Sequence, residues 1–126
     1  MTKASELHYA LVTELQAFIP DGDLITQCLY QPLPRLFAQL SVAAGGNVMG
    51  VERHTHVGIP FLAVAMVRTP ELEAFAQPRV SAWIAAVREF AATLEGGDGN
   101  LEWTYLNYAD GSQDPLGSYG EENLQW

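Results

Sequence analysis

The stretch LEWTYLNYADGSQDPLGSY, residues 101–119, sets the expectation for the rest of the chain. In its first half, successive side chains would point to alternate sides of an extended chain, with the two-residue period of a β-strand. Trp103, Tyr105 and Asn107 fall on one side of this expected strand. The turn-forming residues that follow end the strand and begin an irregular tail, residues 109–126. The strand is therefore expected to carry aromatic rings and an amide to its end, where a ligand would meet them.

The same criteria predict six further elements. Apolar residues recur every three or four positions in the expected helices and every second position in the expected strands. Thr69 and Pro70 have the residue types of a helix N-cap and first helical position, and Pro78 is expected to break or kink that helix because it lacks an N–H. The sequence predicts helices over about residues 4–19, 33–44 and 70–94, and strands over about residues 24–31, 47–51, 59–67 and 101–108.

Without its first helix, this order reads βαββαβ. Such an order predicts an α+β, ferredoxin-like fold, with a four-stranded antiparallel sheet, helices on one face and an extra N-terminal helix. At 126 residues, the chain is expected to form a single domain, residues 1–126. The other face of the sheet would expose apolar groups, which monomers rarely leave in water. We therefore expect a second copy of the chain, in a homodimer, or a ligand to cover it.

Three motifs carry a resemblance to a known family. The run YLNYAD at residues 105–110, with the residues that follow it up to 123, resembles the C-terminal part of the berberine-bridge-type FAD-linked oxidoreductases, of the vanillyl-alcohol-oxidase class. The segments YQPLP at residues 30–34 and GGN at 45–47 resemble the substrate-binding half of that family. The resemblance implies an antiparallel sheet flanked by helices, in agreement with the pattern above.

The FAD domain of such enzymes contains a glycine-rich pyrophosphate loop, and this sequence contains no such motif. We therefore expect the chain to correspond to the substrate-binding part alone and to hold no cofactor of its own.

Composition limits the partners. With 15 acidic and 6 basic residues, the formal charge is −9, which argues against a nucleic acid or an anionic membrane as partner. The sequence has no secretory signal pattern and no apolar run of the roughly 20 residues that a membrane helix needs. The one cysteine, Cys28, allows no internal disulfide and indicates a reducing compartment. A cytoplasmic protein that binds a hydrophobic small molecule is the expectation.

Aromatic residues around the opening stretch are the first candidates for a site. In the enzymes that the chain resembles, the tyrosine that matches Tyr108 can act as a base, and the residues that match Tyr105 and Asn107 lie beside flavin and substrate. A phenol with a pKa of about 10 needs positive charge or a proton acceptor for that role. With Trp103 and Tyr30, these residues are expected to form a substrate-binding wall for a planar ligand. The alternative is that they are ordinary core aromatics.

A polar loop supplies the second set of candidates. Glu52, His54 and His56 are expected to act as general acid and base near neutral pH, or else to form a solvated loop. Two histidines without a third ligand do not predict a metal site. Arg68 is expected to bind a carboxylate or oxyanion of a substrate, or else to form an ion pair with Glu71 or Glu102.

These residues lead to one hypothesis and two alternatives. The hypothesis is a cofactor-independent isomerase, cyclase or dehydratase that acts on a hydrophobic, polyketide-derived or aromatic intermediate of specialised metabolism, by placement and electrostatics. The first alternative is a non-catalytic binding or partner subunit of a flavoprotein. The second is a truncated fragment of an FAD-linked oxidoreductase.

Overall fold

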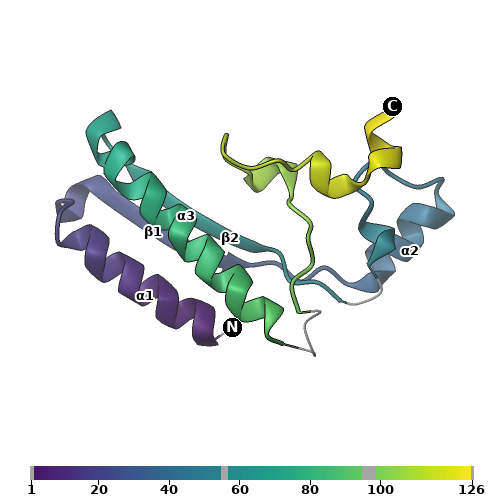
Figure 1. The fold of residues 1–126 in the computed structure, drawn as a ribbon, viewed down its shortest axis with the longest axis horizontal. Coiled ribbons are helices and arrows are strands. Elements are labelled where there is room, and N and C mark those ends of the chain that lie inside the picture. Colours follow the sequence, from purple (N-terminus) through teal and green to yellow (C-terminus); the bar gives the residue numbers. More distant parts are fainter. Residues whose placement is uncertain (1, 55–56, 95–98, 126) are drawn as a thin grey trace. The chain divides into compact units, whose positions relative to one another are not determined.

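The computed structural model describes residues 2–54, 57–94 and 99–125 (Figure 1). Two compact units make up the chain. Unit 1 comprises Met1–Leu29 and Phe61–Asn100, and unit 2 comprises Tyr30–Pro60 and Leu101–Trp126.

Unit 1 contains two long helices and a two-stranded sheet. Its elements are α1 (Thr2–Gln16), the short η1 turn (Asp21–Asp23), β1 (Leu24–Tyr30), β2 (Phe61–Val67) and α3 (Pro70–Ala92). The two strands pair with each other and run antiparallel (Figure 1). Both helices lie on the same face of this sheet (Figure 1). The apolar side of each helix therefore has a partner within unit 1.

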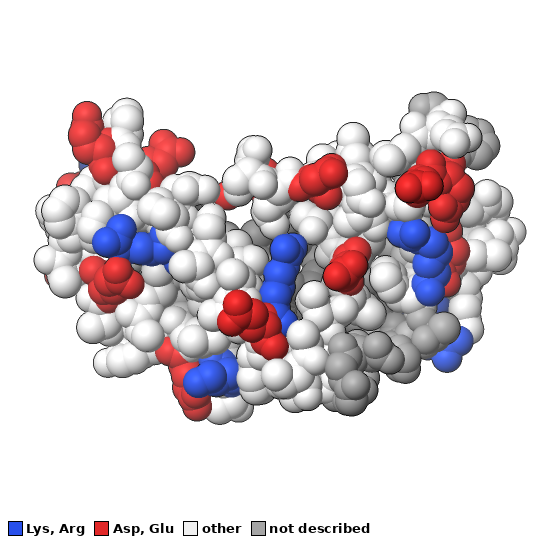
Figure 2. Space-filling view, in the orientation of Figure 1, with Lys and Arg blue, Asp and Glu red and all other residues white. Residues whose placement is uncertain are grey.

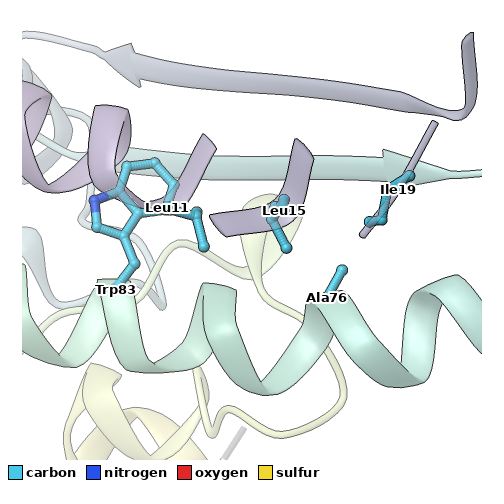
Figure 3. Packing of buried hydrophobic residues seen from close by; sticks show 5 residues of the cluster. All are labelled: Leu11, Leu15, Ile19, Ala76 and Trp83. Atoms are coloured by element: carbon cyan, nitrogen blue, oxygen red, sulfur yellow. The ribbon is translucent and has the colours of Figure 1, made fainter. Parts of the chain in front are cut away.

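The core of unit 1 lies between the helices and the sheet (Figure 3). Leu11 and Leu15 are one helical turn apart on α1, so they point to the same side. Leu15 and Ile19 are 0% and 1% exposed. Burial of a large aliphatic side chain is worth about 1.5–3 kcal/mol. The cluster is completed from α3 by Ala76 and Trp83.

An ion pair joins the two helices. Arg79 Nε on α3 donates to Glu14 Oε1 on α1 at 2.7 Å, and the guanidinium lies 3.6 Å from the centre of the Phe75 ring. The Phe75 ring in turn stacks on Phe18 with centroids 4.1 Å apart. α3 continues through Pro78, so the predicted break at this proline is wrong, while the alternative, a kink, stays a prediction.

The face of the sheet that points away from the helices is apolar. Burial alternates along β1, so that Leu24 and Cys28 pack on the core while Ile25 and Leu29 are exposed. Met66 of β2 is exposed as well. The expectation that a second copy of the chain covers this face stays a prediction.

Unit 2 consists of short elements linked by turns. They are α2 (Arg35–Ala43), η2 (Val51–Arg53), η4 (Leu106–Tyr108), η5 (Gly117–Tyr119) and η6 (Glu121–Gln125). An antiparallel bridge joins Leu33 to Gly58. α2 ends in a Schellman motif, since Gly46 N donates to Ser41 O at 2.7 Å and Gly45 N donates to Val42 O at 3.1 Å. Both glycines have positive φ, and Gly45 is the residue at which a Schellman motif requires it.

Two predicted strands do not form. In the segment 47–51, Asn47 Oδ1 accepts from Met49 N at 2.8 Å, which closes a turn in place of a strand. In the segment 101–108, Thr104 N donates to Ser118 Oγ and Leu106 N donates to Tyr119 Oη, both at 3.0 Å. Side chains therefore take the backbone donors that a sheet would need.

The predicted ferredoxin-like fold is wrong for this reason. The described residues contain three helices and one sheet, whose two strands are β1 and β2. The strands predicted over 24–31 and 59–67 are confirmed with small changes at their ends, and so are the three predicted helices. The error lies in the number of strands and in the sheet that they would have formed.

The core predicts a large effect of one substitution. Leu15→Ala should lower the free energy of unfolding of unit 1 by about 2–5 kcal/mol. The truncation leaves a cavity that the surrounding core side chains fill only in part. Leu29→Ala, at a half-exposed leucine of β1, should cost less than about 1 kcal/mol. Urea denaturation followed by circular dichroism measures both values. Equal losses for the two variants would contradict the assignment of the core.

Candidate functional site

Three aromatic rings of unit 2 form a row. The rings of Trp103 and Tyr105 are stacked with centroids 5.7 Å apart. Tyr105 and Tyr108 then meet edge to face at 4.9 Å. Two of these rings stand before η4 and the third lies at its end. We call these three residues the aromatic row, and the structure thus brings together three of the residues predicted for the substrate wall.

The polar groups of the row are partly engaged. Tyr108 is 41% exposed, and its Oη donates to Gln31 Oε1 at 3.1 Å. Tyr105 Oη accepts from Asn107 Nδ2 at 3.0 Å, and the indole N–H of Trp103 donates to Met49 O at 2.9 Å. An amide oxygen is a neutral acceptor, so these contacts orient Tyr108 but give its phenol no base.

A small hollow lies beside the first ring of the row. The space open to water molecules inside it measures about 20 Å³, which is room for about one water. Counting the open space at its mouth, the hollow measures about 310 Å³. It is lined by Leu33, Pro34, Arg35, Ala38, Val51, His54, Gly58, Leu101 and Trp103. All of these residues belong to unit 2.

Backbone geometry shapes this hollow. The bridge between Leu33 and Gly58 joins two segments that line it. A Cβ at Gly58 would lie 3.0 Å from Leu101 Cδ1, so the glycine permits the close approach of the leucine.

His54 contributes the titratable group of the hollow. Its Nε2 is buried and finds no hydrogen-bond partner among the described residues. Burial lowers the pKa of His54 below its ordinary value, and the positive charge of Arg53 lowers this pKa further. The shift favours the neutral imidazole, which can accept or donate one hydrogen bond at Nε2.

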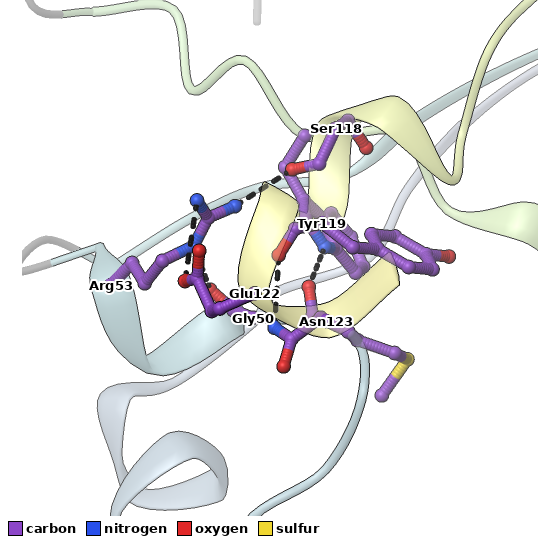
Figure 4. A network of polar contacts seen from close by, with 8 residues as sticks. Gly50, Arg53, Ser118, Tyr119, Glu122 and Asn123 are labelled. Carbon is purple, nitrogen blue, oxygen red and sulfur yellow. Dashed lines mark hydrogen bonds and ion pairs between the residues drawn. The ribbon is translucent and has the colours of Figure 1, made fainter. Parts of the chain in front are cut away.

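Arg53 joins η2 to the C-terminal turns (Figure 4). Its Nη2 donates to Ser118 O at 2.9 Å and its Nε donates to Gly50 O at 3.3 Å. Glu122 Oε1 lies 3.9 Å from Nη1, an exposed pair of little energy. Asn123 Nδ2 adds a bond to Tyr119 O at 3.0 Å. We call this network the Arg53 clasp.

Two glycines make room for the clasp. Gly50 and Gly120 have φ of 64° and 100°, a region that other residues rarely adopt. A Cβ at Gly120 would collide with Arg53 Nη1, and one at Gly50 would collide with Tyr119 O. Sequence reasoning missed this role of Arg53, because Ser118 and Glu122 are distant from it in the chain.

The other predicted site residues are not gathered around the hollow. Arg68 belongs to unit 1 and is 72% exposed, and its Nε lies 2.9 Å from Asp23 Oδ1. Glu52 is exposed on η2, and Tyr30 is half-buried at the end of β1. His56 lies outside the described residues. Arg68 and His54 therefore belong to different compact units. Of the polar-loop candidates, His54 is the one that lines the hollow.

The charged surface offers no broad basic area on the face drawn in Figure 2, where the described Lys and Arg side chains stand apart from one another. Four basic residues pair with acids: Lys3, Arg53, Arg68 and Arg79. Within residues 2–54, 57–94 and 99–125, no group of three or more His, Cys, Asp or Glu side chains is placed to hold a metal ion. None of the helices described there has the length and apolar character to cross a membrane.

Comparison with known proteins connects the chain to a flavoenzyme. The chain is 31% identical over 121 residues to the FAD-dependent monooxygenase drtC of Aspergillus calidoustus. This alignment covers 96% of the chain but 22% of drtC, so the chain spans about a fifth of that relative. The chain resembles a piece of a flavoenzyme. No protein-family model matches it, and no solved structure does.

The described residues do not fit a whole FAD. The hollow beside His54 has room for about one water. The adjacent glycines Gly45 and Gly46 close the C-terminal end of α2, whereas a pyrophosphate binds at the N-terminal end of a helix.

The lowered pKa values predict a pH effect on stability. His8 is stacked on Trp83, and burial lowers its pKa, as it does for His54. The unfolded chain binds more protons than the folded one just below pH 6.5, so the free energy of unfolding should fall as the pH falls through that range. NMR titration of both imidazoles should give midpoints below 6.5.

His54→Gln should remove the contribution of His54 to the pH dependence of the free energy of unfolding, and leave that of His8. Glu71 also has a lowered pKa, but it titrates below 4.5 and leaves the range near 6.5 unaffected. A midpoint for His54 above 6.5 would contradict the burial described here.

The Arg53 clasp predicts local protection of the C-terminal turns. Arg53→Met should raise hydrogen exchange at the amides of residues 117–123 by about tenfold, because a bond from a charged donor contributes about 1.5–3 kcal/mol before screening. Glu122→Gln should change exchange little, since its ion pair is exposed and long. Mass spectrometry of exchanged peptides measures both. Equal effects would mean that charge attraction, and not the bond to Ser118, holds the turns.

Proposed function

We propose that this chain is the substrate-binding part of an FAD-linked oxidoreductase of the berberine-bridge type, with the flavin bound by a separate part of the enzyme. The observation that carries the proposal is the 31% identity to an FAD-dependent monooxygenase over 96% of the chain. The alignment covers 22% of that flavoenzyme, so most of its length lies outside the matched part and is available to bind the flavin.

The aromatic row supports a substrate-binding role. Stacked and edge-to-face rings offer flat apolar surfaces, and planar ligands pack on such surfaces. Trp103 belongs to both the row and the hollow, so a ligand at one of them lies next to the other. The exposed Asn107 and the Gln31–Tyr108 pair supply polar groups at the far end of the row.

The residues of this site bind and orient, and no redox step is assigned to them. Tyr108 donates to a neutral amide, so we propose that it positions a substrate and does not remove a proton. The proposed substrate is hydrophobic and planar, as an aromatic or polyketide-derived compound would be.

One observation favours a second candidate function. His54 is a titratable group in an apolar hollow, which is a setting for general acid–base catalysis. A proton-transfer reaction without flavin, such as isomerisation, cyclisation or dehydration, would use this group. Turnover of a substrate by the flavin-free chain, abolished in His54→Gln, would favour this candidate over the first.

Grafting tests the first proposal. The matching segment of drtC is replaced by this chain, and bound flavin is measured by its visible absorbance. The graft should hold as much FAD as intact drtC, while the chain alone should bind none in an FAD titration. Within the graft, Tyr108→Phe should raise KM roughly 3- to 10-fold at constant FAD content, because one hydrogen bond near the substrate is lost.

Tyr9→Phe is the matched control, since Tyr9 is 76% exposed on α1 and outside the row. It should leave KM unchanged. Stoichiometric FAD binding by the chain alone, or a folded graft without flavin, would overturn the proposal.

A further inference from the structure

His54 presents an unused hydrogen-bonding atom to the hollow. Nε2 is buried and has no partner among the described residues, and His54 lines the hollow. Most buried polar groups in proteins have a partner, and leaving one without a partner costs about 1–3 kcal/mol. The atom therefore has an energetic reason to take up a partner that enters the hollow.

The walls restrict what that partner is. Leu33, Val51 and Leu101 present aliphatic side chains, and Trp103 presents an indole whose own N–H is engaged by Met49 O at 2.9 Å. Apolar walls around one polar atom suit a ligand that is apolar except at one end. The inner space of about 20 Å³ admits a small polar group, while the rest of the ligand lies at the open mouth.

Hydrogen-bond chemistry selects the polar group. In a neutral imidazole, Nε2 donates in one tautomer and accepts in the other. A hydroxyl both donates and accepts, so it satisfies Nε2 in either tautomer. A carbonyl oxygen fits only the donating tautomer, and an amine N–H fits only the accepting one.

Charge favours a neutral ligand. An anionic end would form an ion pair with His54 only if the imidazole were protonated, and burial together with Arg53 lowers the pKa of His54. Two arginines bear on the charge of the hollow: Arg53 on η2, which pairs with Glu122, and Arg35 on α2, which lines the hollow. Arg53 donates to backbone oxygens of Gly50 and Ser118. Arg35 is the group that would favour an anion, and the experiment below includes that outcome.

We propose that the hollow binds the hydroxyl end of a neutral phenol or cyclic alcohol, with His54 Nε2 as its hydrogen-bond partner and Trp103 beside its ring. This inference deepens the proposed function by naming the chemical class of the substrate, and it rests on that function only in calling the ligand a substrate. The anchored ring lies next to the aromatic row.

Binding of small probes to the full chain tests the inference. Phenol, toluene and benzoate are titrated separately, and the chemical shift of the Trp103 indole N–H is followed by NMR. Phenol should bind roughly 3- to 10-fold more tightly than toluene, which matches it in shape but lacks the hydroxyl. His54→Leu should abolish this preference, and His54→Gln, which keeps a hydrogen-bonding group, should restore part of it.

Other outcomes overturn the inference. Equal binding of phenol and toluene by the unmodified chain, which needs no variant to fold, would mean that the hydroxyl is not recognised. Tighter binding of benzoate would assign the hollow to an anion held by Arg35. A long-lived water at His54 that phenol does not displace would assign Nε2 to internal solvent. None of these probes involves flavin. Failure of this inference can therefore be told apart from failure of the proposed function, which the drtC graft tests.

Discussion

Two side-chain hydroxyls determine the course of the chain in unit 2. Ser118 and Tyr119 accept the backbone N–H groups of Thr104 and Leu106, so this segment cannot use those groups to extend a sheet. The Arg53 clasp fastens the same C-terminal turns through Ser118 O. The aromatic row and one wall of the hollow lie on the segment held in this way. The candidate site therefore depends on hydrogen bonds that the C-terminal turns accept, and not on the pairing of a strand in a sheet.

This dependence explains how far the fold was predictable. The spacing of Leu11 and Leu15 on α1 is a local property, and the prediction of that helix is confirmed. The alternation around Trp103 is local too, but an extended segment has the same period whether it pairs with a strand or with side chains. What decides between them is a pair of hydroxyls more than ten residues away, which periodicity does not report. The predicted sheet was therefore too large.

The candidate site was predictable in part for the same reason. His54 stood out as a titratable residue, and the tyrosines were found as neighbours in sequence. The hollow that gives His54 its setting is lined by Leu33, Val51 and Leu101, which are ordinary apolar residues from three distant segments. Arg68 has the right chemistry for a site but belongs to unit 1. Residue type indicated which side chains could take part in proton transfer or binding. The hollow around His54 is formed by residues that only the tertiary structure brings together.

The glycines at the clasp have a consequence for natural variation. Gly50 and Gly120 both have positive φ, and a side chain at either would strike the clasp or the turn beside it. Arg53 occupies the space that Gly120 leaves open. Loss of the Arg53 guanidinium would therefore remove part of the constraint on Gly120. We expect relatives that keep the arginine to keep glycine at the positions of Gly50 and Gly120 as well.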